Sequence, residues 1–273
     1  PTAGTSLSVT ALAGPYRTNL GFATDQDCTR VAIRGYDRFG AQVAERIRYV
    51  QPLTWVQLNR VLRFVFPDLI PDPNGVALAD SIHSFEVVGD NGRVAAYSSI
   101  IDNRTNDGSY LAAQIPSGAA RTAWLPGAAR TSGANDSRWR SDLILLHAGT
   151  LSATTTLDFF SSGAGQGEPG GSFDLTLGAG ESALEEDILH SLFGLSPPAV
   201  GSVSATSPAG AGGLTWMRTY TEEPVAGGEF ETYGQAIAPR DRNDMITISA
   251  NGRVAGFSHD AGSRSNLILQ NTR

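Results

Sequence analysis

The sequence contains no lysine, and all 20 of its basic residues are arginine, against 27 aspartates and glutamates. Isopeptide cross-links from lysine to asparagine, and lysine-mediated covalent linkage between subunits, are therefore excluded. Any assembly of this chain is expected to be non-covalent. The net charge is −7, and the sequence has no basic stripe that could neutralise phosphates, which argues against a nucleic-acid partner.

Cysteine is also nearly absent, since Cys28 stands alone and cannot form an internal disulfide. We expect it to be a small, half-buried strand residue. No apolar run approaches the roughly 20 residues that span a bilayer, so no membrane-spanning segment is expected. The sequence opens on Pro1 without a signal peptide, which favours a processed chain that is extracellular or at the cell surface.

Catalytic motifs are missing as well. The four histidines (His83, His147, His190 and His259) are far apart, and no two have the spacing of metal ligands. The sequence has no nucleophile elbow, phosphate-binding loop or zinc-protease motif. We therefore predict no catalytic residue, no cofactor and no enzyme activity. A hydrolase assembled from distant Ser, His and acidic residues is the least favoured function.

Two acidic loops are candidates for calcium, because carboxylate oxygens at alternating positions suit this ion. The candidate ligands are Asp102, Asp107, Asp241 and Asp244. Both loops also contain arginine, and Asn-Asp-Gly is a common turn without any metal. Turns that hold no metal are therefore favoured.

The sequence is rich in turn and strand formers. It has 31 glycines and 14 prolines, and Thr, Ser and Val crowd the intervals between them, as is typical of β-sandwiches. Alternating patterns predict strands at 6–12, 17–22, 28–36, 43–50, 81–88, 93–102 and 110–115. They predict a second series at 123–129, 139–147, 153–160, 173–177, 201–206, 214–221 and 231–237.

One short phrase occurs three times: Arg17-Thr18-Asn19-Leu20, Arg140-Ser141-Asp142-Leu143 and Arg264-Ser265-Asn266-Leu267. The copies are 123 and 124 residues apart. A second marker, 110–116, recurs 123 residues later as 233–239. A period of this size indicates duplicated domains rather than a short solenoid repeat. The phrase arginines are expected to make hydrogen bonds or ion pairs at the end of a sandwich.

The fold class predicted from these observations is all-β. It consists of two tandem immunoglobulin-like antiparallel sandwiches, over 1–117 and 118–243, followed by a hairpin over 244–273 that opens a third repeat. Helical spacing of apolar residues over 52–66 and 183–193 predicts one short inserted helix in each sandwich. The four tryptophans (Trp55, Trp124, Trp139 and Trp216) are expected to pack in cores rather than to stack on sugars.

The chain resembles tandem repeats of uncharacterised secreted or surface proteins of bacteria. Their phrases have counterparts here in Trp139–Leu143, Asp187–Leu189, Leu192–Gly194, Arg218–Tyr220 and Thr232–Gln235, with a sister version in Asp102–Thr105 and Gly108–Tyr110. The resemblance covers nearly the whole chain. It implies a repeated β domain outside the cell and implies no catalytic residues.

The segment 244–273 carries the functional prediction. A hairpin alone in water is marginal, because its apolar face and backbone edges need partners. Donation of this segment to a neighbouring copy would build a non-covalent head-to-tail polymer. The assembly residues would be Ile246, Ile248, Val254, Phe257, Leu267 and Leu269. The alternative is an adhesin or carbohydrate-binding module of a larger surface protein, with glycans as partners.

Overall fold

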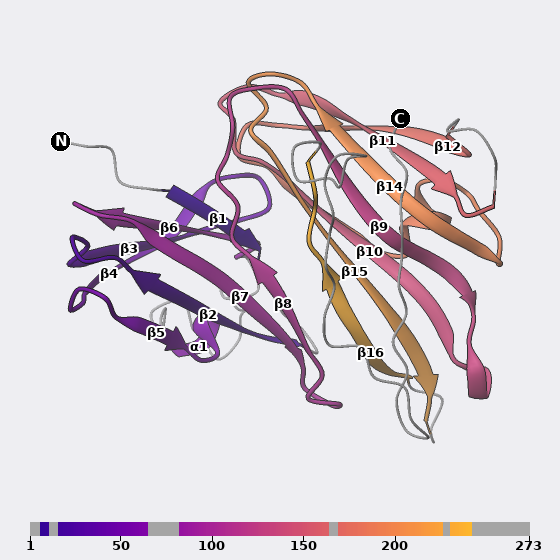
Figure 1. The fold of residues 1–273 in the computed structure, drawn as a ribbon, viewed down its shortest axis with the longest axis horizontal. Helices are drawn as coiled ribbons and strands as arrows, with labels where there is room; N and C mark the ends of the chain where they lie inside the picture. The colour runs from indigo at the N-terminus through magenta and orange to yellow at the C-terminus, as the bar shows by residue number, and fades with distance from the viewer. Residues whose placement is uncertain (1–5, 11–15, 65–81, 164–168, 226–229, 242–273) are drawn as a thin grey trace, which may run out of the picture.

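The structure is a computed structural model that describes residues 6–10, 16–64, 82–163, 169–225 and 230–241. It is all-β, with three antiparallel sheets (Figure 1). The predicted all-β antiparallel class is therefore confirmed. The hairpin predicted over 244–273, with Asp244, Arg264, Asn266 and the six assembly residues, lies outside the described residues.

We define unit 1 as the strands from Ser6 to Ala112 and unit 2 as those from Arg121 to Ile237. The elements of unit 1 are β1 (Ser6–Thr10), β2 (Tyr16–Thr24), β3 (Arg30–Tyr36), β4 (Gln42–Tyr49), β5 (Trp55–Leu58), α1 (Val61–Phe64), β6 (Ser84–Asp90), β7 (Val94–Asp102) and β8 (Gly108–Ala112). Those of unit 2 are β9 (Arg121–Ser132), the 3-10 turn Ala134–Asp136, β10 (Arg138–His147), β11 (Ala153–Ser161), β12 (Gly171–Leu177), β13 (Ser182–Glu185), α2 (Ile188–Ser191), β14 (Ala199–Ser207), β15 (Gly213–Pro224) and β16 (Phe230–Ile237).

The two units repeat one strand order. Unit 1 has the sheets β1-β6-β3-β4 and β5-β2-β7-β8, and unit 2 has the orders β9-β14-β11-β12 and β13-β10-β15-β16. Each strand of unit 2 therefore takes the place of the strand of unit 1 whose label is lower by eight. In unit 2, β9 pairs with β14 and also, at its last two residues, with β10. This pairing joins the two layers of unit 2 into one curled eight-stranded sheet (Figure 1).

Alternation of apolar residues builds a core between the two layers of unit 1. Side chains from both of its sheets belong to one buried cluster, among them Leu20, Phe22, Val31, Ile33 and Phe85. Cys28, expected to be half-buried, is fully buried in this cluster. Unit 2 has its own cluster, which includes Leu125, Leu143, Leu157, Val203 and Met217.

Both inserted helices are far shorter than predicted, so the helical interpretation of 52–66 and 183–193 was wrong at its N-terminal part. Residues 55–58 and 182–185 are instead edge strands, and each is followed by a helix of four residues. The physical reason is tertiary. Each segment lies beside a phrase strand, β2 or β10, which offers it backbone partners over four residues.

The second sequence marker does not occupy equivalent positions. In unit 1, Arg17 lies opposite Ile101, and Tyr110 lies opposite Ser99, two residues before Ile101. In unit 2, Arg140 lies opposite Tyr220, and Tyr233 lies opposite Thr221, one residue after Tyr220. The two tyrosines therefore lie three ladder positions apart. Of the two markers, the arginine phrase alone aligns the units in space.

The two units share an apolar interface. Ile144, Leu146, Leu214 and Trp216 of unit 2 are buried in the same cluster as the core residues of unit 1. The Trp216 indole N–H donates to the carbonyl of Ala112 at 2.9 Å. These contacts pack the two units against each other. The chain between β8 and β9 connects them (Figure 1).

Candidate functional site

The third residue of the phrase holds the turn that leads into each short helix. Asn19 accepts a hydrogen bond through Oδ1 from the backbone N–H of Arg60 at 2.8 Å. Asp142 accepts one through Oδ1 from the backbone N–H of Asp187 at 2.9 Å. Arg60 and Asp187 each immediately precede the helix, and both have a left-handed backbone, with φ of 48° and 47°.

This arrangement gives a physical reason for the repeated Asn or Asp. A non-glycine residue in the left-handed region is strained, and a buried N–H needs an acceptor. A short side chain with an acceptor oxygen on the neighbouring strand supplies that acceptor at both turns. Asn19 is 7% exposed, so loss of its oxygen would leave the donor without water to replace it.

The phrase arginines bind different partners in the two units. Arg17 donates to the side-chain oxygens of Asn103 and Asn106, both at 3.0 Å. Arg140 donates to Asp187 at 2.6 Å and to Glu222 at 3.3 Å. Arg17 therefore makes side-chain hydrogen bonds, and Arg140 makes hydrogen bonds that are also ion pairs.

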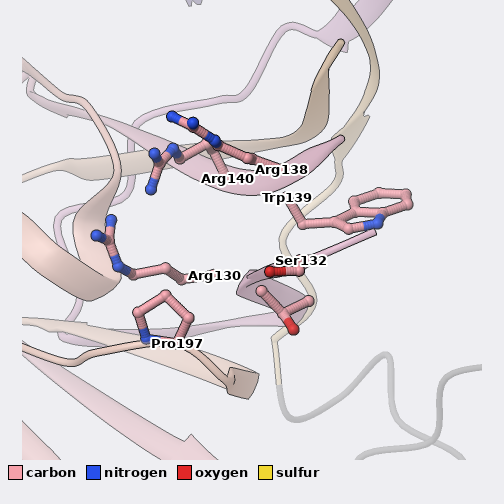
Figure 2. Close-up of a pocket in the computed structure, with 7 residues that line it drawn as sticks. Arg130, Ser132, Arg138, Trp139, Arg140 and Pro197 are labelled. Atoms are coloured by element: carbon pink, nitrogen blue, oxygen red, sulfur yellow. The ribbon is translucent and has the colours of Figure 1, made fainter. Parts of the chain in front are cut away.

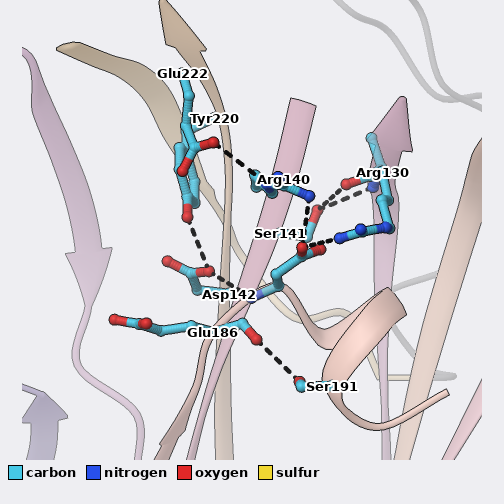
Figure 3. A network of polar contacts seen from close by, with 10 residues as sticks. Arg130, Arg140, Ser141, Asp142, Glu186, Ser191, Tyr220 and Glu222 are labelled. Atoms are coloured by element: carbon cyan, nitrogen blue, oxygen red, sulfur yellow. Dashed lines mark hydrogen bonds and ion pairs between the residues drawn. The ribbon is translucent and has the colours of Figure 1, made fainter. Parts of the chain in front are cut away.

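Asp187 joins a polar network in unit 2. Figure 3 labels Arg130, Arg140, Asp142 and Tyr220 among the members of this network. Its Oδ2 binds the guanidinium groups of Arg130 and Arg140 together. Among the described residues, its Oδ1 and the Nε of Arg130 have no hydrogen-bond partner. Asp187 therefore contacts two cations, of which Arg140 is also paired with Glu222, and part of the hydrogen-bonding capacity of the network is unused.

Withdrawal from solvent raises the pKa of Asp142 from 3.8 to about 6. The N–H of Asp187 and the hydroxyl of Tyr220, which both donate to this carboxylate, oppose the shift in its pKa. Burial also raises the pKa of Tyr220, and the neighbouring Asp142 adds to that rise. Tyr220 therefore stays protonated and remains a donor to Asp142.

A pocket of about 240 Å³ lies beside this network, where β9 ends and β10 begins. Its lining residues are Arg130, Thr131, Ser132, Arg138, Trp139, Arg140 and Pro197. Figure 2 shows the three arginine side chains on one side and the Trp139 indole pointing away from them. Arg138 lies over the ring of Phe230 at 5.3 Å and forms no ion pair with another described residue. Chemically, the pocket suits a small anionic group.

The first calcium candidate loop connects the two units instead of presenting free ligands. Oδ2 of Asp102 accepts the Thr232 hydroxyl at 2.6 Å, and its Oδ1 accepts the backbone N–H of Arg104 at 2.7 Å. Oδ2 of Asp107 accepts the backbone N–H of Gly234 at 2.7 Å. The hydrogen bonds of this loop lower the pKa of Asp102, although burial opposes that shift. Asp102 and Asp107 are therefore both used to hold β16 of unit 2.

In the described part of the chain, no three His, Cys, Asp or Glu side chains are grouped so that they could hold a metal ion. Asp241 lies at the last described position. His147 is fully buried, and its Nε2 is 2.9 Å from the Thr155 hydroxyl. His259 lies outside the described residues.

The tryptophans divide in a way that the sequence did not indicate. Trp216 is 1% exposed, as expected of a core residue, and Trp124 and Trp139 are half-buried. Trp55 is 61% exposed, so its predicted place in a core was wrong. The edge strand β5 explains the difference, because alternation along this strand turns Leu58 inward and Trp55 outward.

Sequence reasoning missed Arg130 as a partner of the phrase, and also Tyr220 and Glu222. Tyr220 and Glu222 lie more than 45 residues from Asp142 in the sequence, whereas Arg130 is closer. No short motif connects any of the three with Asp142. The sequence did contain one indication of this network. Asp187-Ile188-Leu189 matches a phrase of the bacterial repeats that the chain resembles, and Asp187 is the residue that binds both Arg130 and Arg140.

No helix within the described residues is long and apolar enough to cross a bilayer. Comparison with known proteins gives no assignment: no family model matches the chain, and no curated protein matches it.

Proposed function

We propose that the chain is a non-catalytic structural subunit of an extracellular filament or surface assembly. In this proposal the subunits join head to tail without covalent bonds, through strands donated by 244–273. Each unit is taken to be an immunoglobulin-like sandwich of the kind found in tandem repeats of secreted bacterial proteins. The buried contacts between units 1 and 2 support this role, because a structural subunit has to resist bending between its domains.

The observation that carries the proposal is the pairing of the phrase strands. β2 lies between β5 and β7, and β10 lies between β13 and β15, so each phrase strand depends on strands that follow it in its own unit. A third phrase strand at 264–267 would need the same kinds of partner. In both described units these partners are already paired with β2 or β10. We infer that the third strand pairs instead with a sheet edge of a neighbouring copy, or takes the place of β1 there.

One result in the structure limits how the donated strands enter. β1 pairs with β6 over five residues, so the opening position of unit 1 is filled by its own strand. Donation therefore proceeds by addition to an edge or by displacement of β1. Displacement of β1 exchanges one set of backbone hydrogen bonds for another. In this proposal the net gain in free energy comes from burying the apolar residues of 244–273.

Deletion of 244–273 tests the proposal directly. We expect the shortened chain to be a folded monomer by multi-angle light scattering, whereas the whole chain forms higher oligomers at the same concentration. The matched control keeps the full length of the chain and replaces both Ile246 and Leu267 with Asp. If the shortened chain forms the same polymers as the whole chain, donation through 244–273 is wrong.

The second candidate function is a glycan-binding module, which the arginine pocket favours. A sugar carboxylate would pair with Arg138, which forms no ion pair with another described residue. We expect glucuronate to bind with measurable heat in calorimetry, glucose to show none, and Arg138→Ala to weaken glucuronate at least about fivefold. Charge-assisted contacts to arginine are typically worth this much or more. Equal affinity of glucose and glucuronate would contradict this candidate.

A further inference from the structure

We propose that the outer face of the sheet β5-β2-β7-β8, together with the turn before β5, is a docking surface for unit 2 of a second copy of this chain. The proposal deepens the head-to-tail assembly put forward above and rests on it. It names a different contact, one that does not use 244–273.

Unit 1 covers one face of unit 2. Along β10 and β15 the side chains alternate between two clusters. Leu143 and Met217 belong to the core of unit 2, whereas Ile144 and Trp216 belong to the cluster shared with unit 1. The outer face of β13-β10-β15-β16 is therefore the surface on which unit 1 packs.

The ladders identify the same face in unit 1. Ile144 lies opposite Trp216, and its equivalent, Gly21, lies opposite Tyr97. In the same way Leu146 lies opposite Leu214, and their equivalents in unit 1 are the pair Ala23 and Ala95. By this register Tyr97 takes the place of Trp216, and Tyr110 takes the place of Ala236.

The turn before the edge strand is equivalent in the two units as well. Leu53 and Gly180 both have positive φ, 57° and 72°. The residues that follow them, Thr54 and Glu181, accept hydrogen bonds from the backbone N–H groups at the ends of the phrase strands β2 and β10. Trp55 therefore corresponds to Ser182.

In unit 2 this turn is part of the inter-unit contact. The backbone N–H of Ser182 donates to the carbonyl of Arg38 at 2.9 Å. Gly40 of unit 1 approaches so closely that a Cβ on it would lie 2.6 Å from the carbonyl carbon of Gly180. The β3–β4 turn of unit 1 thus packs against the β12–β13 turn of unit 2.

In unit 1 the equivalent surface is uncovered and apolar. Leu53 is 77% exposed, Trp55 61% and Tyr110 60%. Tyr97 stacks on Tyr110 with ring centroids 4.9 Å apart, and it lies over Gly21, where a Cβ would come within 2.2 Å of the ring. Large aromatic side chains gathered on one exposed face are typical of a protein interface.

A second copy is the occupant that the structure favours, because unit 2 repeats the strand order of unit 1. The part of unit 1 that packs on unit 2 includes β8, whose Ala112 carbonyl accepts the Trp216 indole. In unit 2 the strand in the place of β8 is β16, which ends its sheet among the described strands. The loop 102–107 of unit 1 bonds to β16 at 230–234, so the contact proposed for a second copy is made by the part of β16 that follows, 235–237. A contact from β16 to the outer face of β2 and β7 in the next copy is heterologous and does not close, so it extends into a filament.

The test uses the full chain and a double variant, Trp55→Glu with Tyr110→Glu. Both side chains are exposed, so the fold should be retained, and thermal unfolding checks this. Leu151→Glu, at a residue 71% exposed on unit 2, is the control for added charge. We expect sedimentation velocity to show at least a tenfold weaker self-association for the double variant and an unchanged one for Leu151→Glu. Wild-type-like assembly of the double variant, or equal weakening by the control, overturns the inference.

The same experiment separates this contact from strand donation. If the double variant is monomeric while the chain without 244–273 still assembles, the aromatic face is the contact and donation is wrong. If only the deletion abolishes assembly, donation stands and the face is not an interface. A whole chain that stays monomeric up to about 1 mM, a concentration at which even weak specific contacts are populated, overturns both.

Discussion

Replacing Trp216 with alanine is expected to lower the free energy of unfolding by about 3–5 kcal/mol, the usual cost of truncating a buried large aromatic side chain. Trp216 is 1% exposed and packs in the cluster shared by the two units. The substitution also leaves the Ala112 carbonyl without its indole donor. Loss of this side chain should separate unfolding of unit 2 from that of unit 1.

The matched control is Tyr97→Ala, at the equivalent position of unit 1. Tyr97 contacts Tyr110 and donates to Gln57, but the face on which it lies is open to solvent. We expect a loss of about 1 kcal/mol for this variant, in line with an exposed aromatic pair. Chemical denaturation of both variants checks the comparison, and equal losses would show that the inter-unit interface contributes little.

Replacing Asp142 with asparagine is expected to stabilise the protein above pH 7. The pKa of Asp142 is raised from 3.8 to about 6, so the folded state prefers the protonated carboxyl group. Its contribution to stability is fully present below pH 3.8 and is lost as the pH rises through about 6. An asparagine cannot ionise, yet its oxygen can still accept from Asp187 and Tyr220. The expected gain is about 2 kcal/mol at pH 8, with no gain at pH 3.5.

Unit 1 supplies the reciprocal variant, because it carries asparagine where unit 2 has aspartate. Asn19 is 7% exposed and makes the equivalent bond to the N–H of Arg60. Asn19→Asp should therefore destabilise the protein at pH 8 and recover stability as the pH falls toward 4, since burial disfavours the charged form. Urea denaturation at pH 4, 6 and 8 measures both variants. A stability difference between wild type and Asp142→Asn that does not change with pH would show that Asp142 keeps its ordinary pKa in the fold.

Much of the fold follows from alternation along the chain. The turn Asp90-Asn91-Gly92 connects β6 and β7 between two predicted strands, and Asn91 has the positive φ, 61°, that such turns require. The strands of both units lie close to their predicted bounds. The two short helices were overestimated because apolar residues at helical spacing also occur where an edge strand turns into a single helical turn. Neighbouring strands decided this outcome, and a local pattern contains no information about them.

The candidate site was only partly predictable. The repeated phrase marked Arg140 and Asp142, but its meaning depends on Asp187, 45 residues later in the chain. No local rule pairs a strand residue with the backbone N–H of a distant turn. Likewise, Asp102 and Asp107 have the composition of a calcium loop, and only the proximity of β16 shows that their oxygens are occupied by Thr232 and Gly234.

The sequence by itself determined the all-β class, the positions of most strands and the duplication, because alternation and the arginine phrase are local properties of the chain. The tertiary structure decided which of two equivalent faces is covered. Trp216 and Tyr97 occupy the same position in the same strand order, yet one is buried against unit 1 and the other lies on an open face. That difference comes from the packing of one unit on the other, a contact between residues more than 100 positions apart.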